Sequence, residues 1–256
     1  TTPAFEAPFA SPPRVEVFVS EEWSLEALKR AAELPNVSVV LATRTNMLRP
    51  EHALFLKRHR AGAVTLHAPL LQPHVEQLRK LPRTLLVFEV DGDRDLEALA
   101  RVPLVGTQPV RVRAKVLTPA LAETMSRLKG AVLELDLRSR TPEQDELALL
   151  ARLRAQPTFR IAAGQHELVP GLALLKPRLL VVEADEDRLP KPLQDALRQA
   201  GIPVRVSVSA GVAVSDVARF SKLPGVELEL QLQGGREEQL ARVRRTIAGL
   251  SPEAAQ

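Results

Sequence analysis

Residues 110–137, VRVRAKVLTPALAETMSRLKGAVLELDL, decide the fold of this chain. Apolar and polar residues alternate over 110–116 and again over 131–137, as they do in strands that bury one face. Between these runs, Pro119 stands where the first turn of a helix tolerates proline, and an amphipathic stretch follows it. The segment therefore predicts a strand, a helix and a second strand. Because a helix supplies the crossover that neighbouring parallel strands need, we expect the two strands to be parallel.

The same pattern recurs along the whole chain. Strands are predicted over residues 14–20, 37–43, 63–68, 84–90, 110–116, 131–137, 159–163, 179–184, 204–209 and 226–232. The repeat averages roughly 23 to 24 residues, which is short for an eight-unit (β/α) barrel and falls within the range of leucine-rich repeats. We predict an α/β protein with about ten βα units in a single domain over residues 14–250, preceded by an irregular lead-in at 1–13 and followed by a tail at 251–256.

The two faces of the predicted strands differ in character. In the run 110–116, one face carries only apolar side chains, whereas the other carries Arg111, Arg113 and Lys115. On the next strand, the same mixed face of the sheet carries Glu134 and Asp136. A doubly wound sheet would be apolar on both faces. Two architectures remain: a TIM-barrel-like barrel, closed or partial, whose interior pairs these charges, and a leucine-rich-repeat-like βα horseshoe with a wet concave face.

Asparagine content separates these two architectures. Leucine-rich repeats place an asparagine at each turn, where its side chain bonds to the backbone, and this chain contains only Asn36 and Asn46. A ladder of asparagines is therefore excluded. We take the barrel as the leading prediction and keep the horseshoe as the alternative.

Composition narrows the classes of partner. The net charge is +4, but basic and acidic residues are intermixed, and aromatic residues make up only 3% of the chain. Nucleic acid is disfavoured, because readers of single strands stack bases on aromatic side chains. The absence of cysteine rules out disulfides and an iron–sulfur cluster. The sequence has no apolar run long enough to cross a membrane, so we predict a cytoplasmic protein without a membrane partner and leave its oligomeric state open.

The C-terminal quarter carries a resemblance to a known group of barrels. Residues 201–243, GIPVRVSVSAGVAVSDVARFSKLPGVELELQLQGGREEQLARV, resemble the last two units of phosphate-binding TIM barrels. The resemblance implies that two loops hold an anion through backbone N–H groups. The matching positions are Ser209, Ala210, Gly211, Gly234 and Gly235.

A second resemblance lies nearer the N-terminus. Residues 41–69, LATRTNMLRPEHALFLKRHRAGAVTLHAP, are similar in rhythm to an early βαβ unit of radical-SAM barrels. That activity needs three cysteines, so the resemblance implies a fold and no chemistry.

Active sites of (β/α) barrels form where strands end, so the candidate catalytic residues are those at strand C-termini. We select four of them as an acid–base or oxygen-rich set: His67, Glu89, Asp136 and Glu183. Such a set suits Mg²⁺ or Mn²⁺, although we assign no residue as a metal ligand and the cofactor stays unknown. Lys115 is a further candidate, as a Schiff-base lysine near Arg111 and Arg113, or as a partner of Glu134 or Asp136.

These residues lead to two functional hypotheses. The first is an enzyme that acts on a small anionic or phosphorylated substrate through its strand-end carboxylates. The alternative is a non-catalytic scaffold that presents a charged strand face to a protein partner.

Overall fold

The computed structural model describes the greater part of the chain. The described residues are 14–20, 25, 29, 37–42, 48–58, 62–66, 72–81, 84–92, 95–97, 99, 109–128, 130–184, 189–209 and 226–233. The predicted lead-in at 1–13 and tail at 251–256 lie outside these residues, and the domain limits stay a prediction.

The described residues contain ten strands, each within two residues of a predicted one at either end. They are β1 (Arg14–Ser20), β2 (Val37–Ala42), β3 (Gly62–Leu66), β4 (Leu85–Val90), β5 (Val110–Ala114), β6 (Ala131–Asp136), β7 (Thr158–Ala162), β8 (Leu179–Ala184), β9 (Val204–Ser209) and β10 (Val226–Gln233). Every neighbouring pair is parallel. The α/β class and the parallel sheet are therefore confirmed.

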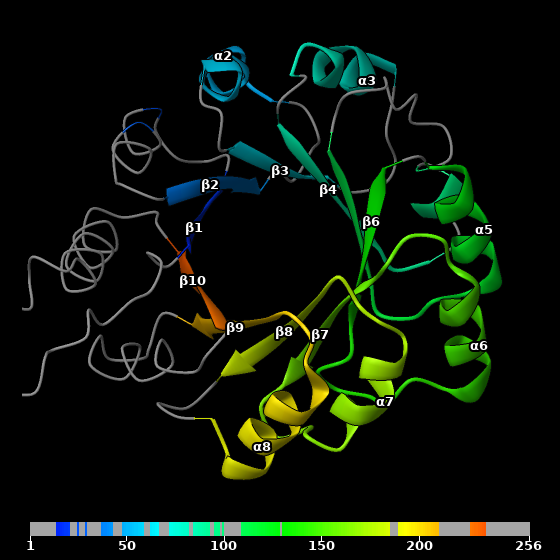
Figure 1. The fold of residues 1–256 in the computed structure, drawn as a ribbon. Helices are drawn as coiled ribbons and strands as arrows, with labels where there is room; N and C mark the ends of the chain where they lie inside the picture. The colour runs from blue at the N-terminus through cyan, green and yellow to red at the C-terminus, as the bar shows by residue number, and fades with distance from the viewer. Residues whose placement is uncertain are drawn as a thin grey trace, which may run out of the picture.

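The sheet closes on itself. Strand β1 pairs on one side with β2, where Val15 lies opposite Val37, and on the other side with β10, where Val15 lies opposite Leu230. The strand order is that of a closed barrel, seen along its axis in Figure 1. The horseshoe alternative is therefore wrong, because it requires the first and last strands to stand apart. Ten strands are two more than in a TIM barrel, which accounts for the short repeat, and kinship with TIM barrels stays a prediction.

Helices cover the outside of the barrel (Figure 1). The described ones are α2 (Pro50–Arg58), α3 (Gln72–Arg79), α5 (Pro119–Arg127), α6 (Gln144–Arg152), α7 (Leu168–Leu174) and α8 (Lys191–Ala200). Helix α5 begins where the sequence predicts: Pro119 occupies its first turn, and the Leu121 amide donates to the Thr118 hydroxyl at 3.2 Å. None of the helices that the structure describes combines the length and hydrophobicity that a bilayer crossing requires.

The apolar core lies between the strands and the helices. Outward-facing residues of the strands, such as Val112, Leu133 and Val182, are fully buried there. Leu121 of α5 and Leu193 of α8 belong to the same cluster. The apolar face that the alternation predicts is thus the outer face of the barrel, which leaves the mixed face to line the interior.

Gly201 ends helix α8 in a left-handed conformation, with a φ of 61°. We expect Gly201→Ala to lower the free energy of unfolding by about 1 kcal/mol, because a Cβ is strained at positive φ. Gly171, inside α7, is the matched control: its φ is not positive and an added Cβ would meet no neighbour. Gly171→Ala should raise stability by about 0.5–1 kcal/mol. Urea unfolding measures both, and equal losses would contradict the assignment.

Candidate functional site

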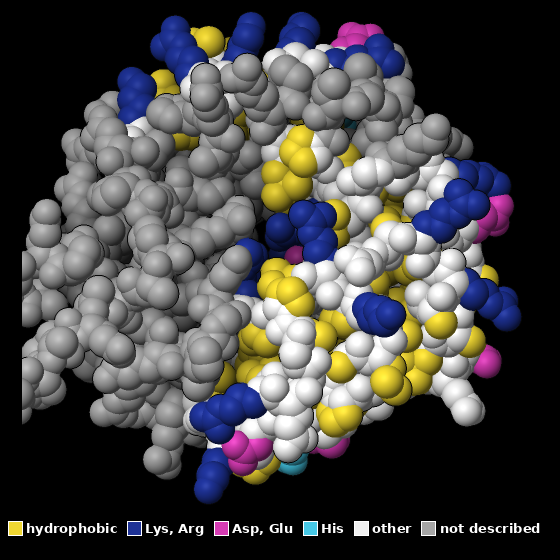
Figure 2. All heavy atoms as spheres, viewed as in Figure 1, with side chains coloured by type: hydrophobic (Ala, Val, Ile, Leu, Met, Phe, Trp, Pro, Cys, Tyr) yellow, Lys and Arg dark blue, Asp and Glu magenta, His cyan; other side chains and the backbone are white. Residues whose placement is uncertain are grey.

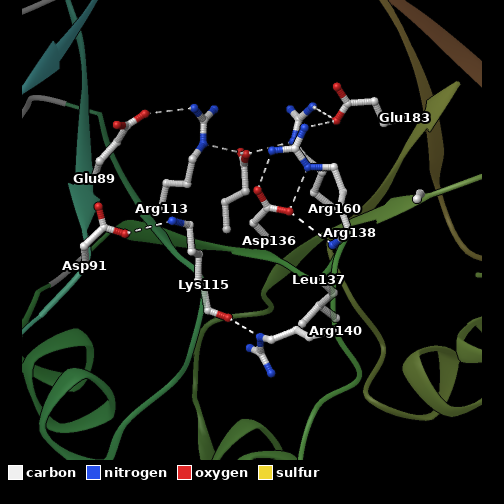
Figure 3. A network of polar contacts seen from close by, with 12 residues as sticks. Glu89, Asp91, Arg113, Lys115, Asp136, Leu137, Arg138, Arg140, Arg160 and Glu183 are labelled. Atoms are coloured by element: carbon white, nitrogen blue, oxygen red, sulfur yellow. Dashed lines mark hydrogen bonds and ion pairs between the residues drawn. The ribbon is translucent and has the colours of Figure 1, made fainter. Parts of the chain in front are cut away.

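A chain of ion pairs crosses the interior of the barrel (Figure 3). Its centre is Glu134 on β6, which contacts three guanidinium groups. Arg113 Nε lies 3.0 Å from Glu134 Oε1, Arg160 Nε lies 3.3 Å from the same oxygen, and Arg111 Nη1 lies 3.4 Å from Oε2. Arg113 also reaches Glu89 Oε1, at 3.4 Å. These ion pairs therefore join strands β4, β5, β6 and β7.

Strand register and burial explain the ionisation state of the Glu134 carboxylate. Arg113 lies directly opposite Glu134 in the β5–β6 pairing, and the Glu134 side chain is only 2% exposed. Burial by itself raises the pKa of Glu134, but the guanidinium groups of Arg113, Arg160 and Arg111 outweigh it and hold that pKa below the ordinary value. Glu134 is thus an ionised carboxylate that holds cations in place.

A second cluster stands at the carboxyl ends of β6 and β8. Arg138 donates to both oxygens of Asp136, from Nε at 2.8 Å and from Nη2 at 2.6 Å, and its Nη1 donates to Glu183. Arg160 Nη1 lies 3.7 Å from Glu183 Oε2 and connects this cluster to Glu134. Burial raises the pKa of Asp136, but the hydrogen bonds and charge of Arg138 lower it overall. The pKa of Arg138 is raised in turn.

Three of the predicted catalytic residues thus belong to one network. Glu89, Asp136 and Glu183 are brought together by arginines (Figure 3). Within the described part of the chain, no group of three or more His, Cys, Asp or Glu side chains is arranged to hold a metal ion.

The other predicted site residues lie elsewhere. Lys115 is 74% exposed, and its Nζ lies 3.5 Å from Asp91 Oδ1. Its described partner is therefore neither Glu134 nor Asp136, and it is not buried as a Schiff-base lysine requires. Ser209 ends β9, and its side chain is outside the described atoms. Five further predicted positions lie outside the described residues, namely His67, Ala210, Gly211, Gly234 and Gly235.

A buried clasp holds the loops that follow β5 and β6. Glu146, at the start of α6, accepts from the Leu117 amide at 2.7 Å and from Arg140 Nη1 and Nη2 at 2.6 and 2.7 Å. Arg140 Nε also donates to the Lys115 carbonyl at 2.5 Å. Burial raises the pKa of Glu146, but the hydrogen bonds from Arg140 and Leu117 lower it overall. The clasp fixes the carboxyl end of the barrel beside the ion-pair network.

A cavity of about 260 Å³ opens at the other end of the strands. Three of its lining residues, Pro109, Gly130 and Arg178, directly precede β5, β6 and β8, so its mouth is at the amino ends of the strands. Its remaining lining residues are Leu85, Val110, Arg111, Val132, Glu134, Thr158, Arg160, Leu179, Val181 and Arg205. On the face shown in Figure 2, Lys and Arg side chains gather around the hollow at the barrel centre.

The cavity is the part of the site that sequence reasoning missed. Attention to strand C-termini selects the opposite end of the barrel. Arg111 and Arg205 are visible in the sequence as charges on alternating strands. Arg160 gives a weaker signal, because β7 is buried from Thr158 to Ile161 and its residues do not divide into an apolar and a charged face. Arg178 gives no such signal, because it precedes its strand.

Comparisons with known proteins leave the family open. No protein-family model and no curated protein matches the chain. Among the solved structures that match is D-threo-3-hydroxyaspartate dehydratase from Delftia sp. HT23, with 17% identity and a TM-score of 0.33. The match covers 91% of this chain and spans 56% of that enzyme. At this TM-score, the similarity supports no inference about fold family or activity.

Proposed function

We propose that this chain is a barrel protein that binds a small anionic molecule inside the barrel. One observation carries the proposal: the described side chains that line the interior cavity include four arginines, Arg111, Arg160, Arg178 and Arg205, and among these described side chains the one carboxylate is that of Glu134.

The charge around the cavity favours an anion for physical reasons. An arginine keeps its charge at any physiological pH, so burial cannot neutralise it by proton loss. Glu134 is already shared by Arg111, Arg113 and Arg160. A planar guanidinium offers paired N–H donors that match the oxygens of a carboxylate or a phosphate. An anion in the cavity would therefore place negative charge and acceptor oxygens beside guanidinium groups that outnumber the carboxylates described around it.

The chemistry of the cavity suits binding better than proton transfer. Glu134 is its one described carboxylate, and its lowered pKa makes it a weak base. An efficient general base needs a pKa nearer the working pH.

A second candidate function places catalysis at the opposite end of the barrel. Glu89, Asp136 and Glu183 converge there through Arg113, Arg138 and Arg160, at the end where (β/α) barrel enzymes carry their active sites. This arrangement favours the predicted enzyme that acts on a small anionic substrate.

The scaffold alternative has less support. The charged strand face that it would offer to a protein partner lines the interior, where the side chains of Glu134 and Arg160 are only 2% and 5% exposed.

Ligand binding by the native state tests the proposal. We expect inorganic phosphate, phosphate monoesters or small carboxylates to raise the melting temperature, since a ligand at 100 times its Kd stabilises by about 2.7 kcal/mol. Arg111→Met should weaken binding about tenfold or more, because it removes a charged donor. Arg198→Met, which removes an exposed arginine paired with Asp195 on α8, is the matched control. A melting temperature unchanged by every anion would contradict the proposal.

A further inference from the structure

The cavity has an apolar wall as well as a cationic one. Leu179 and Val181 of β8 and Val132 of β6 line it, together with Leu85 of β4. Val181 is buried, although it faces the interior together with charged neighbours. A site for a bare ion would gain nothing from this surface, because apolar area contributes only when a ligand removes it from water.

The size of the cavity also indicates a ligand larger than a single acidic group. Its volume of about 260 Å³ corresponds to about nine water molecules at about 30 Å³ each. A single phosphate or carboxylate group fills only part of that space. The rest would hold water against Leu179, Val181 and Val132 unless the ligand carries an apolar body of its own.

Two arginines are placed to hold the acidic group. Arg178 is exposed at the mouth, and its side chain makes no hydrogen bond or ion pair with any residue in the described ranges. Arg111, further inside, contacts Glu134 through Nη1 alone among the described atoms. Both guanidinium groups thus keep N–H donors that can turn to the same anion.

We infer that the ligand is a small amphipathic organic acid, a phosphate monoester or a carboxylate with a short hydrocarbon body. Its acidic group binds Arg111 and Arg178, and its hydrocarbon part packs on Leu179, Val181 and Val132. The inference rests on the proposed function and adds the class of ligand to it.

A homologous series of ligands measures the apolar part directly. Titration calorimetry on the full chain would use methyl, ethyl, propyl and butyl phosphate, and in a second arm acetate, propionate, butyrate and pentanoate. Each added methylene should tighten binding about three- to fourfold until the cavity is full. The arm with the lower Kd values identifies the acidic group.

Variants separate the two halves of the site. Arg178→Met should weaken every member of the series by the same factor, about tenfold, and it should not affect folding because Arg178 is exposed. Leu179→Ser and the nearly isosteric Val132→Thr should flatten the dependence on chain length while methyl phosphate or acetate binds as before. Unchanged melting temperatures of the unliganded variants would show that each one folds.

The outcomes distinguish the inference from the proposed function. Binding of all members with the same Kd would overturn the inference and leave the anion site in place. An unaltered chain-length dependence in both wall variants would also overturn it. Failure of every member to bind, including the shortest ones, would defeat the proposed function and the inference together.

Discussion

Glu134→Gln should lower the free energy of unfolding by about 3–5 kcal/mol, the cost typical of removing one partner from a buried ion pair. The substitution keeps the size of the side chain but removes the negative charge that Arg111, Arg113 and Arg160 share. Two of these guanidinium groups lie 3.0 and 3.3 Å from the same oxygen, so they would repel each other without the carboxylate between them, and only the longer contacts to Glu89 and Glu183 would remain. Urea unfolding followed by circular dichroism measures the loss.

Glu123→Gln is the matched control for this substitution. Glu123 pairs with Arg127 one turn along helix α5, and both side chains are exposed. An exposed pair of this kind contributes only about 0.3–0.5 kcal/mol. If Glu134→Gln and Glu123→Gln cost the same, the buried network does not stabilise the barrel.

Stability should also fall steeply in acid. The pKa values of Glu134, Asp136 and Glu146 are all lowered in the folded protein. A carboxylate with a lowered folded pKa binds protons more readily in the unfolded chain. Its contribution is therefore fully present above its unfolded pKa, about 4, and is lost as the pH falls through the folded value. All three contributions act in the same direction, so the loss of stability in acid should exceed that of any one of these carboxylates.

Urea titrations at intervals from pH 7 to pH 3 would show this loss as a falling midpoint below about pH 5. Glu146→Gln should start from a lower stability at pH 7 and lose less on acidification, because the group that titrates in the clasp with Arg140 is gone. A midpoint that stays constant down to pH 3 would show that arginines do not hold these carboxylates ionised in the native state.

The elements of the barrel were predictable because their signals are local. Residues 110–116 and 131–137 alternate with a period of two, and the structure places β5 and β6 there with the apolar face outward. Pro119 and Thr118 mark the start of α5 in the same local way. Local sterics and the solvation of one face decide such features, so a single sequence carries them.

The candidate site was predictable only in part. The position of Glu89, Asp136 and Glu183 at strand ends predicts them as site residues, and the structure joins them through Arg113, Arg138 and Arg160. Lys115, which ends the same alternating run as Arg113, is instead exposed beside Asp91. The difference arises because strand β5 stops at Ala114, so Lys115 lies beyond the interior that its period of two implies.

The sequence by itself determined the order of strands and helices, the parallel sense of pairing and the charged character of one strand face. Only the tertiary structure decided that β1 meets β10 and that the charged face encloses a cavity at the amino ends of the strands. Closure depends on the twist and stagger accumulated over all ten strands, which no local pattern encodes. Arg111 and Arg178 lie 67 positions apart in the chain and line the same cavity solely because the barrel closes.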